Sequence, residues 1–572
     1  MQIPFIGTAI LLVIYQLFFF HTGFGLGWLA FLIPAHLYIL LTHRKNGNGV
    51  LSVISSILAL LLYGLSAWSG NWITQSVSLL TAIGLSFFTV FTSKLKTPFS
   101  WTFLHTIFAP LLVLLYGCGN TLFRLFHRES KEKSTKKDTH LFSHIRGFLF
   151  ALPVIIILFT LFQSADPLYN KFIHTLFDTI GDRLFTTGII GVFFLFIGSI
   201  ALTAPPTLPE QHKQIKEGIY EELRMFLGLI AFVIGTFVVV QIRYLFLRVG
   251  ETELSSILGV AGYTYSQYVT KGFFELIIAS GIAGIVLLYG AYQYSHVIPQ
   301  KKRPLQFLAF GIGIEVMVLI ASALQRLQLY VGNHGLTLAR GYGALLLVSI
   351  TIAIILCVLQ YIVTLKKIPR YILWSLPVLV FLFGLHVIPL DRLIATRFPP
   401  TVNGVIDYYY ISLLSQEAYP SWTQAMTETR RISKNLSEKK EWSGQERADL
   451  FWTEKTLGNL CASMTEVTVL FGTIDEIRTI RSACLPHEPI SLSKVNETGK
   501  LSDLPSYFYQ RRGWQSFTYA NYQAYRYLWS HKEIIQMAQE SNVYIGSITA
   551  HFSKNWETAI PHDRRIEPLF LK

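Results

Sequence analysis

Four short polar segments interrupt the apolar second half of this chain, and each carries charged side chains. The segments are SADPLY at 164–169, QIRYLF at 241–246, YSQYVTKGFFEL at 265–276 and SALQRLQLYVGNHGLTLAR at 322–340. Their charged residues are Asp166, Arg243, Lys271, Glu275, Arg326 and Arg340. In a membrane protein such residues either pair with one another or line the path of a ligand or ion. Both alternatives stay open, since a pair such as Lys271 and Glu275, four residues apart, also stabilises a helix start without any ligand.

Glu315 stands apart from these segments. It is the single acidic residue of the apolar stretch 305–325 and lies near its middle. A carboxylate facing lipid at that depth costs a few kcal/mol. We therefore expect the side chain to face the interior of a helical bundle, to be protonated or to have a partner. It is either a satisfied interior carboxyl or part of a proton or cation relay.

Patterns that would identify a common enzyme are absent from the sequence. There is no Walker A loop, no HExxH pair and no G-x-S-x-G elbow, which argues against ATP-driven transport, zinc proteolysis and common hydrolase chemistry. The four cysteines, Cys118, Cys357, Cys461 and Cys484, fall in no metal-binding spacing. We therefore predict no metal, cofactor or catalytic residue. Cys461 and Cys484 share a polar region and could form a disulfide if that region faces an oxidising compartment.

The positions of these residues depend on helices that cross a membrane. A spanning helix needs about 20 mainly apolar residues. Twelve segments meet this requirement, namely 3–21, 24–42, 50–68, 72–92, 101–122, 147–163, 184–204, 225–247, 272–292, 305–325, 341–364 and 371–389. The sequence therefore predicts a mainly α fold, a polytopic transmembrane helical bundle of about 12 spans. Segment 101–122 contains Pro110, so it is either a kinked span or a re-entrant loop.

The orientation of the bundle follows from Lys and Arg in short loops, which are enriched on the cytoplasmic side. Residues 123–146 carry seven of them, Arg124, Arg128, Lys131, Lys133, Lys136, Lys137 and Arg146, so we place this loop in the cytoplasm. Counting spans forward then places all four polar segments, and everything after residue 390, at the extracytoplasmic face. Counting backward fits less well, because the basic residues at 44–45 and 94–96 then lie outside the cytoplasm.

The composition indicates that lipid solvates most of the chain. The 572 residues are 52% hydrophobic and 14% charged, whereas soluble domains are roughly 25% charged. This excludes a water-soluble enzyme and a disordered chain. Residues 1–390 hold 27 basic and 14 acidic side chains, so nearly all of the net charge of +14 lies in loops beside the membrane. Such a surplus indicates contact with the lipid bilayer rather than with nucleic acid.

The composition changes after residue 390. The rest of the chain carries 21 basic and 20 acidic side chains, as in an ordinary extramembrane domain. Apolar spacing predicts helices over 405–426, 442–469 and 519–540, and a loop with short strands over 470–510. We divide the chain into N-terminal transmembrane helices (1–122), a basic cytoplasmic loop (123–146), a transmembrane core (147–390) and a mixed but mostly helical C-terminal polar domain (391–572).

The polar segments, taken in order, resemble a known pattern. SADPLY after an apolar run, YLF closing a span, GFFEL opening one, and SALQRLQLY followed by GLTLAR are similar to motifs of uncharacterised bacterial multi-pass membrane proteins known only as a domain of unknown function. IDYYYISLLSQEAYP at 406–420 and WQSFTYANYQAY at 514–525 extend the resemblance, which covers roughly 147–530. The resemblance implies a helical membrane core with a C-terminal domain, and it implies no activity, substrate or catalytic residue.

Three classes of function remain open. The first is an envelope interaction, sensing or assembly protein of the bacterial inner membrane, which binds another envelope protein through its extracytoplasmic domain. The second is a secondary, proton-coupled transporter that uses Glu315, although no inverted repeat supports it. The third is a lipid-linked glycosyltransferase, whose characteristic acidic pair in the first external loop is absent here. We favour the first class, because the polar domain emerges at the same face as the four polar segments.

Overall fold

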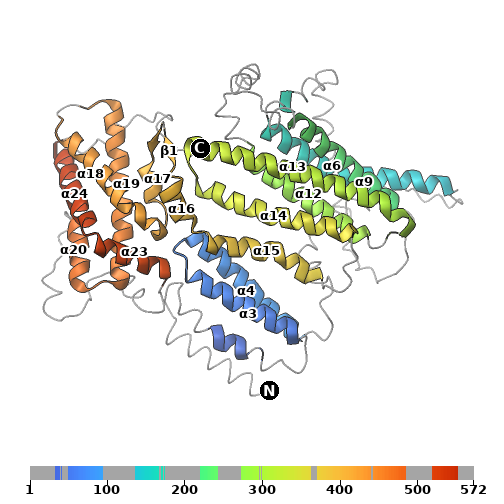
Figure 1. Ribbon diagram of the computed structural model, residues 1–572, viewed down its shortest axis with the longest axis horizontal. Helices are drawn as coiled ribbons and strands as arrows, with labels where there is room; N and C mark the ends of the chain where they lie inside the picture. Colours follow the sequence, from blue (N-terminus) through green and yellow to red (C-terminus); the bar gives the residue numbers. More distant parts are fainter. Residues whose placement is uncertain are drawn as a thin grey trace, which may run out of the picture. The chain divides into compact units, whose positions relative to one another are not determined.

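In the computed structural model, the described part of the chain is mostly α-helical (Figure 1). The structure describes residues 32–38, 40, 49–94, 136–166, 169–171, 173, 219–241, 272–294, 297, 299–362, 370–402, 404–439, 442–484 and 518–551. The chain divides into two compact units. One contains Met1–Phe99, His334–Leu338 and Leu382–Lys572, and the other contains Ser100–Asn333 and Ala339–Phe381.

The unit that contains the middle of the chain is built from long apolar helices. They are α6 (Lys136–Ala165), α9 (Ile219–Gln241), α12 (Phe273–Tyr294), the 3-10 helix η2 (Pro299–Lys301), α13 (Lys302–His334), α14 (Leu338–Ile362) and the first part of α15 (Arg370–Val387). Leu227, Leu287 and Ile312 are among the fully buried residues of its core. Phe232 and Phe307 are 69% and 76% exposed. Large apolar side chains turned outward on long helices are expected where lipid surrounds them.

Several of these helices are compatible with a membrane protein. Among the described residues, four helical segments are long and apolar enough to cross a bilayer, namely Tyr220–Gln241, Phe273–Ala291, Lys302–His334 and Leu338–Ile362. A fifth is added if Leu376–Val387 and Leu390–Arg397, bent by 51° around Pro389, form one span. Proline explains the bend, because it removes a backbone donor and clashes with the preceding turn.

Most of the predicted spans that the structure describes coincide with helices. Helices cover all or most of 50–68, 72–92, 147–163, 225–247, 272–292, 305–325, 341–364 and 371–389. Segments 3–21, 101–122 and 184–204 lie outside the described residues, as does 24–42 apart from 32–38 and 40. The total of about 12 spans therefore stays a prediction. Helix α6 also includes residues 136–146, for which the charge pattern predicts part of the basic loop.

Helix α13 is longer than predicted. The span was expected to end near 325, but the helix runs on to His334 because Ala323, Arg326 and Tyr330 continue its buried face. Gly335 follows with φ +74°, the left-handed conformation that commonly ends a helix. A Cβ at this position would lie 2.2 Å from the carbonyl oxygen of Pro399, so the chain requires glycine here.

The other unit joins an N-terminal helical hairpin to the C-terminal domain. Its described elements are α3 (Gly49–Ser66), α4 (Trp72–Lys94), the end of α15, α16 (Leu390–Arg397), β1 (Thr401–Val402), β2 (Val405–Ile406), α17 (Tyr408–Ser412), the 3-10 helix η3 (Gln416–Ser421), α18 (Trp422–Ser437), α19 (Gly444–Phe471), α20 (Ile474–Cys484), α23 (Tyr519–Ser530) and α24 (Glu533–His551). The strands form an antiparallel hairpin. Trp422, Met464 and Leu528 belong to the core of the helical bundle.

The C-terminal domain departs from the predicted helix pattern in two places. Residues 405–426 do not form one helix, because Asp407 caps α17, Ser415 caps η3 and Pro420 lies inside η3. Each cap accepts a hydrogen bond from a backbone N–H and so begins a new helix. The loop predicted over 470–510 is wrong for 474–484, which form α20, and residues 485–510 lie outside the described residues. The predicted helices over 442–469 and 519–540 match α19 and α23–α24, with a break at His531.

A disulfide crosslinks the helical bundle. Cys461 of α19 and Cys484 of α20 are bonded, with their Cα atoms 5.5 Å apart. The bond closes a loop of 23 residues between two adjacent helices. Such a crosslink reduces the conformational freedom of the unfolded domain.

Removing this crosslink should lower the stability of the C-terminal domain. The chain-entropy model gives about 3 kcal/mol for a loop of this length. We expect the double substitution Cys461→Ser and Cys484→Ser to lower the Tm of the purified full-length protein. A thiol reductant should lower the Tm of the parent chain and leave that of the double variant unchanged. Equal melting temperatures for parent and variant would contradict the stabilising role of the bond.

Candidate functional site

A buried ion pair connects the C-terminal end of α6 to α13. Arg326 Nη2 on α13 is 2.8 Å from Asp166 Oδ2, which directly follows α6, and the two side chains are 0% and 2% exposed. Arg326 is the largest fully buried side chain among the described residues. Its Nη1 also donates to the carbonyl oxygen of Ala165, 2.7 Å away, at the C-terminal end of α6. A cation is favourable there, because the last carbonyls of a helix carry partial negative charge.

Two further side chains complete what we call the Asp166–Arg326 network, which consists of Asp166, Gln241, Ser322 and Arg326. Gln241, the last residue of α9, donates from Nε2 to Asp166 Oδ2. Ser322 Oγ on α13 donates to Gln241 Oε1 at 3.0 Å. The other carboxylate oxygen, Asp166 Oδ1, accepts from the backbone N–H of Tyr169 at 3.2 Å. The network therefore ties together the ends of α6 and α9 and the interior of α13.

Gly272 brings the third polar segment, 265–276, to the same place. It precedes α12 and has φ +89°. A Cβ at this residue would lie 2.3 Å from both the Ala165 carbonyl oxygen and Arg326 Nη1. The backbone thus passes directly against the ion pair, where only glycine leaves enough room. All four polar segments of the sequence contribute to this one location, through Asp166, Gln241, Gly272 and Arg326.

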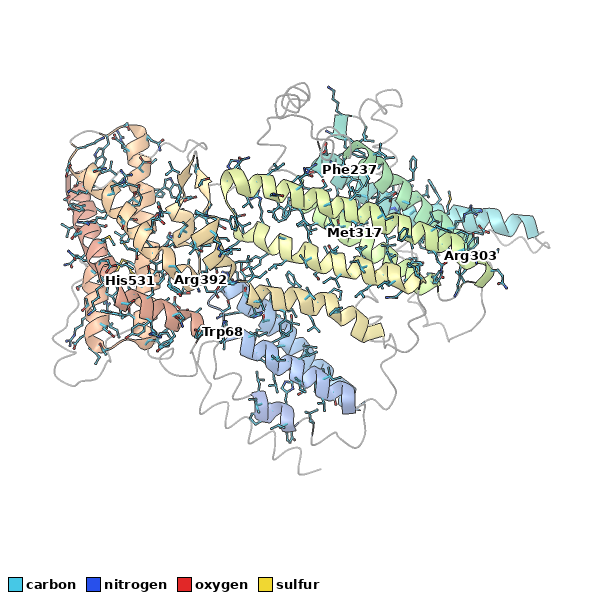
Figure 2. All side chains as sticks on the ribbon, viewed as in Figure 1. Trp68, Phe237, Arg303, Met317, Arg392 and His531 are labelled. Atoms are coloured by element: carbon cyan, nitrogen blue, oxygen red, sulfur yellow. A yellow bond between two sulfur atoms is a disulfide. The ribbon has the colours of Figure 1, made fainter. Side chains whose placement is uncertain are left out.

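Aromatic side chains close the network on the side of α6 and α9. Phe237, labelled in Figure 2, stacks on Phe162 with ring centroids 4.2 Å apart. Tyr169 meets Phe237 edge to face at 5.1 Å, and its hydroxyl lies 3.2 Å from Thr236 Oγ1. Phe162, Tyr169 and Phe237 are all fully buried. These rings keep the surroundings of the ion pair apolar, which strengthens its electrostatic attraction.

The remaining candidate residues lie outside this network. Glu275 of α12 accepts from Ser164 Oγ at 3.4 Å. The guanidinium of Arg340 stacks 3.5 Å from the ring centre of Tyr330, joining the start of α14 to the end of α13. Arg243 and Lys271 lie outside the described residues, so the suggested pairing of Lys271 with Glu275 stays a prediction.

Glu315 occupies a separate position on α13. Its Oε1 lies 3.0 Å from the place where a Cβ at Gly235 of α9 would be. Its Oε2 is buried and has no hydrogen-bond partner among the described residues. The carboxyl thus faces α9 in the bundle interior, as expected for an acidic residue in an apolar span.

The arrangement around Asp166 is suited to holding helices together. The carboxylate accepts three donors and the opposite charge of Arg326 is in direct contact with it. Removing either charge would leave the other buried and uncompensated. Among the described residues, no group of three or more His, Cys, Asp and Glu side chains is placed to hold a metal ion.

A second, mostly buried polar cluster lies in the unit that contains the N-terminal helical hairpin and the C-terminal domain. The sequence did not predict this cluster. Asp391 Oδ2 on α16 accepts from Asn71 Nδ2 at 2.7 Å and from Ser415 Oγ at 2.5 Å. Glu417 Oε1 accepts from Ser69 Oγ at 2.7 Å and from the backbone N–H of Gly70 at 2.9 Å. The Asn71 N–H donates to Ser69 Oγ, and the Glu417 N–H donates to Ser415 Oγ.

These hydrogen bonds form a closed ring, which we call the carboxyl ring (Ser69, Asn71, Asp391, Ser415 and Glu417). It joins the loop between α3 and α4 to α16 and η3. Residues 69–71 had looked like a turn between two spans, and Ser415 and Glu417 like parts of a helix. The sequence signal at this place is Asp391, an acidic residue two positions after the last apolar segment, and it does not indicate which residues complete the ring.

Glu417 should make stability depend on pH. Burial raises its pKa above the usual value, the hydrogen bonds from Ser69 and Gly70 oppose this, and the charge of Asp391 adds to it. The folded protein therefore holds this proton more tightly than the unfolded chain. The contribution of Glu417 to stability is full below its unfolded pKa of 4.5 and is lost as the pH rises through the folded pKa.

The substitution Glu417→Gln tests this dependence. Glutamine keeps an acceptor oxygen for both donors and removes the titrating group, so the decline of Tm with rising pH should become shallower. The measurement is thermal unfolding of the full-length protein with a chelator present, between about pH 4 and pH 8. Glu438→Gln, at an exposed carboxyl after α18, is the matched control. An unchanged pH profile in Glu417→Gln would contradict the assignment.

The sequence profile of a protein family described as "Domain of unknown function (DUF4153)" matches residues 7–425. The chain belongs to this family. The DUF4153 match includes the N-terminal spans, in which no motif had been recognised, and ends within α18, short of the 530 expected from the resemblance. No curated protein and no solved structure matches the chain. Asp166, Arg326, Asp391 and Glu417 all fall within the DUF4153 region.

Proposed function

We propose that this DUF4153 protein is a multi-pass protein of the bacterial inner membrane whose C-terminal domain faces the extracytoplasmic compartment and binds another envelope protein, in sensing or assembly. The observation that carries this proposal is the disulfide between Cys461 and Cys484 in a helical bundle that follows apolar helices. Disulfides persist in oxidising compartments and are rare in the bacterial cytoplasm.

The distribution of basic residues supports the same orientation. The stretch 123–146 carries seven Lys and Arg residues, which favours the cytoplasmic side. Lys301, in η2 between α12 and α13, and Lys302, the first residue of α13, lie at the connection expected on that side as well. With an alternating path, the last apolar helix then delivers the C-terminal domain to the opposite face.

The carboxyl ring supports a role in which the domain communicates with membrane helices. Through Asn71 and Ser69, the loop between α3 and α4 is hydrogen-bonded to Asp391 and Glu417. The backbone N–H groups of Tyr519 and Ala520, at the start of α23, also donate to carbonyl oxygens of this loop. A partner that displaces the bundle would therefore act directly on an apolar hairpin, as a sensing or assembly protein requires.

Cysteine accessibility in intact cells tests the orientation. Asn435 is exposed on α18, and Gln300 is exposed on η2 between α12 and α13. An impermeant thiol reagent should label Asn435→Cys in intact cells and Gln300→Cys only after permeabilisation. The parent chain reports the labelling of its own cysteines and serves as the control. The reverse pattern would overturn the proposed orientation and place the domain in the cytoplasm.

A proton-coupled transporter is the second candidate, and Glu315 is the observation that favours it. Its carboxyl lies inside an apolar span with one oxygen unpartnered among the described residues. In a proton-coupled carrier, Glu315→Gln should abolish proton uptake into vesicles that hold the purified protein. A structural carboxyl would instead leave proton flux unchanged and alter only the melting temperature.

A further inference from the structure

Two buried oxygen atoms beside the carboxyl ring lack a hydrogen-bond partner in the described part of the chain. They are Asp391 Oδ1 and Asn521 Oδ1, on side chains that are 1% and 9% exposed. Asp391 Oδ1 is an acceptor when the carboxyl is ionised, and Asn521 Oδ1 is an amide carbonyl oxygen, which only accepts. Burying an acceptor without a partner costs free energy. Such atoms therefore indicate an unassigned positive or donating partner.

Two amide oxygens lie close to Gly70. A Cβ at Gly70 would lie 3.1 Å from Ala520 Cβ, 3.4 Å from Asn521 Oδ1 and 3.6 Å from Gln416 Oε1, so both amide oxygens lie within 4 Å of one point. Gln416 Nε2 donates to Glu466 Oε2 at 2.8 Å, which fixes the orientation of this amide and turns its oxygen toward Gly70. The N–H of Gly70 itself binds Glu417 Oε1.

Among the described residues, no basic side chain forms an ion pair with Asp391 or Glu417. Both carboxyls accept hydrogen bonds from hydroxyl, amide and backbone groups instead. The neighbouring Arg392 is turned to the ring of Tyr419, 5.8 Å from its centre. Trp68 and Arg392 are labelled in Figure 2. Two adjacent carboxylates, one buried and one half-buried, are unfavourable without a cation, so a bound positive charge would stabilise them.

We propose that a hard divalent cation, with Ca²⁺ the best match, binds between the 67–71 loop and the C-terminal domain, held by the carboxylates of Asp391 and Glu417 and the amide oxygens of Asn521 and Gln416. Ca²⁺ takes carboxylate and carbonyl oxygens in irregular geometry, whereas Mg²⁺ demands a near-ideal octahedron. The donor set contains no sulfur or imidazole, which Zn²⁺ and Cu²⁺ prefer. This proposal does not depend on the compartment of the domain.

A cation at this position would connect three elements. Its ligands come from α16, from η3 and from α23, and the adjacent loop joins α3 to α4. Trp68 in this loop stacks on Tyr519 at the start of α23, with ring centroids 4.3 Å apart. Binding should therefore tighten the contact between the helical hairpin and the C-terminal domain, and the fluorescence of Trp68 should report it.

Thermal unfolding tests the proposal. The purified full-length protein is first stripped of metal ions with a chelator, and its Tm is then measured as Ca²⁺ is added at fixed pH and ionic strength. A ligand that binds the folded state raises Tm in a saturable way. We expect this rise in the parent chain and in Glu438→Gln, the exposed control. Asp391→Asn and Gly70→Ala should lose it, the first by removing a ligand charge and the second by filling the space at the amide oxygens. Asn521→Asp, which adds a carboxylate, should saturate at a lower Ca²⁺ concentration.

Several results would overturn the proposal. One is a parent chain whose Tm does not respond to Ca²⁺, and another is an equal response in Asp391→Asn and the parent, which would indicate binding elsewhere. A Tm that depends on pH but not on Ca²⁺ would show that the carboxyls share a proton instead. If Asp391→Asn fails to fold, Glu417→Gln gives the same comparison, since it keeps the acceptor for Ser69 and Gly70.

Discussion

Arg326→Leu should destabilise the protein by about 3–5 kcal/mol, the range for breaking a buried ion pair by removing one partner. Arg326 is fully buried and in contact with Asp166, which is 2% exposed. Without the guanidinium, the Asp166 carboxylate would be left in an apolar surrounding next to Phe162 and Tyr169. The measurement is equilibrium unfolding of the purified protein in mixed micelles, followed by helical circular dichroism.

The paired substitution distinguishes the ion pair from general packing. Asp166→Leu should lower the free energy of unfolding by a similar amount. The double variant Asp166→Leu with Arg326→Leu should lose less free energy of unfolding than the two single variants together, because neither charge is then buried without its partner. Coupling in this double-mutant cycle is the expected signature. Strictly additive single effects, or losses well below about 1 kcal/mol, would contradict the central role assigned to the pair.

Gly272→Ala should lower the stability of the protein by a comparable amount, because it strains the backbone. Its φ of +89° is unfavourable for any residue with a Cβ, which costs about 1–3 kcal/mol. The new Cβ would also meet the Ala165 carbonyl oxygen and Arg326 Nη1, each at 2.3 Å. Relieving that contact requires the ion pair to move. The backbone strain and the loss of the Asp166–Arg326 network should therefore both destabilise the folded protein. We expect a large drop in Tm and in the yield of monodisperse protein.

A glycine on α12 provides the matched control. At Gly281 a Cβ would have its nearest neighbour outside the adjacent helix backbone, Ile350 Cδ1, 4.0 Å away, which is ordinary contact. Because Gly281 lies inside a regular helix, alanine there should be neutral or stabilising by up to about 1 kcal/mol. A Gly272→Ala protein as stable as Gly281→Ala would show that the backbone does not press against the ion pair.

The helices of the apolar spans were predictable from sequence. An uninterrupted apolar stretch of about 20 residues is a strong signal, because no other backbone conformation satisfies its hydrogen bonds in lipid. Helix ends were less predictable. The polar residues of 322–334 looked like a connection, yet they continue α13, because Ser322 and Arg326 are satisfied inside the bundle. Polar side chains can therefore continue a span where the bundle supplies their hydrogen-bond partners.

The two polar clusters differ in how far sequence could predict them. The clustering of Asp166 and Arg326 followed from counting spans, since both lie at the same ends of apolar segments. Whether they pair depends on the rotation of α6 and α13, which spacing alone does not determine. The carboxyl ring was out of reach, because Asn71 and Ser69 meet partners 320 and 348 residues later, and no local pattern connects such positions.

The long separation within the carboxyl ring sets the order in which the protein can be completed. Asn71 is made 320 residues before Asp391. At roughly 5–20 residues per second, the ribosome needs roughly 15–65 s to supply that partner. During this interval the amide of Asn71 and the hydroxyl of Ser69 must be hydrated, and the α3–α4 hairpin lacks the contacts that hold its loop. The hairpin is therefore among the first parts synthesised and among the last to mature.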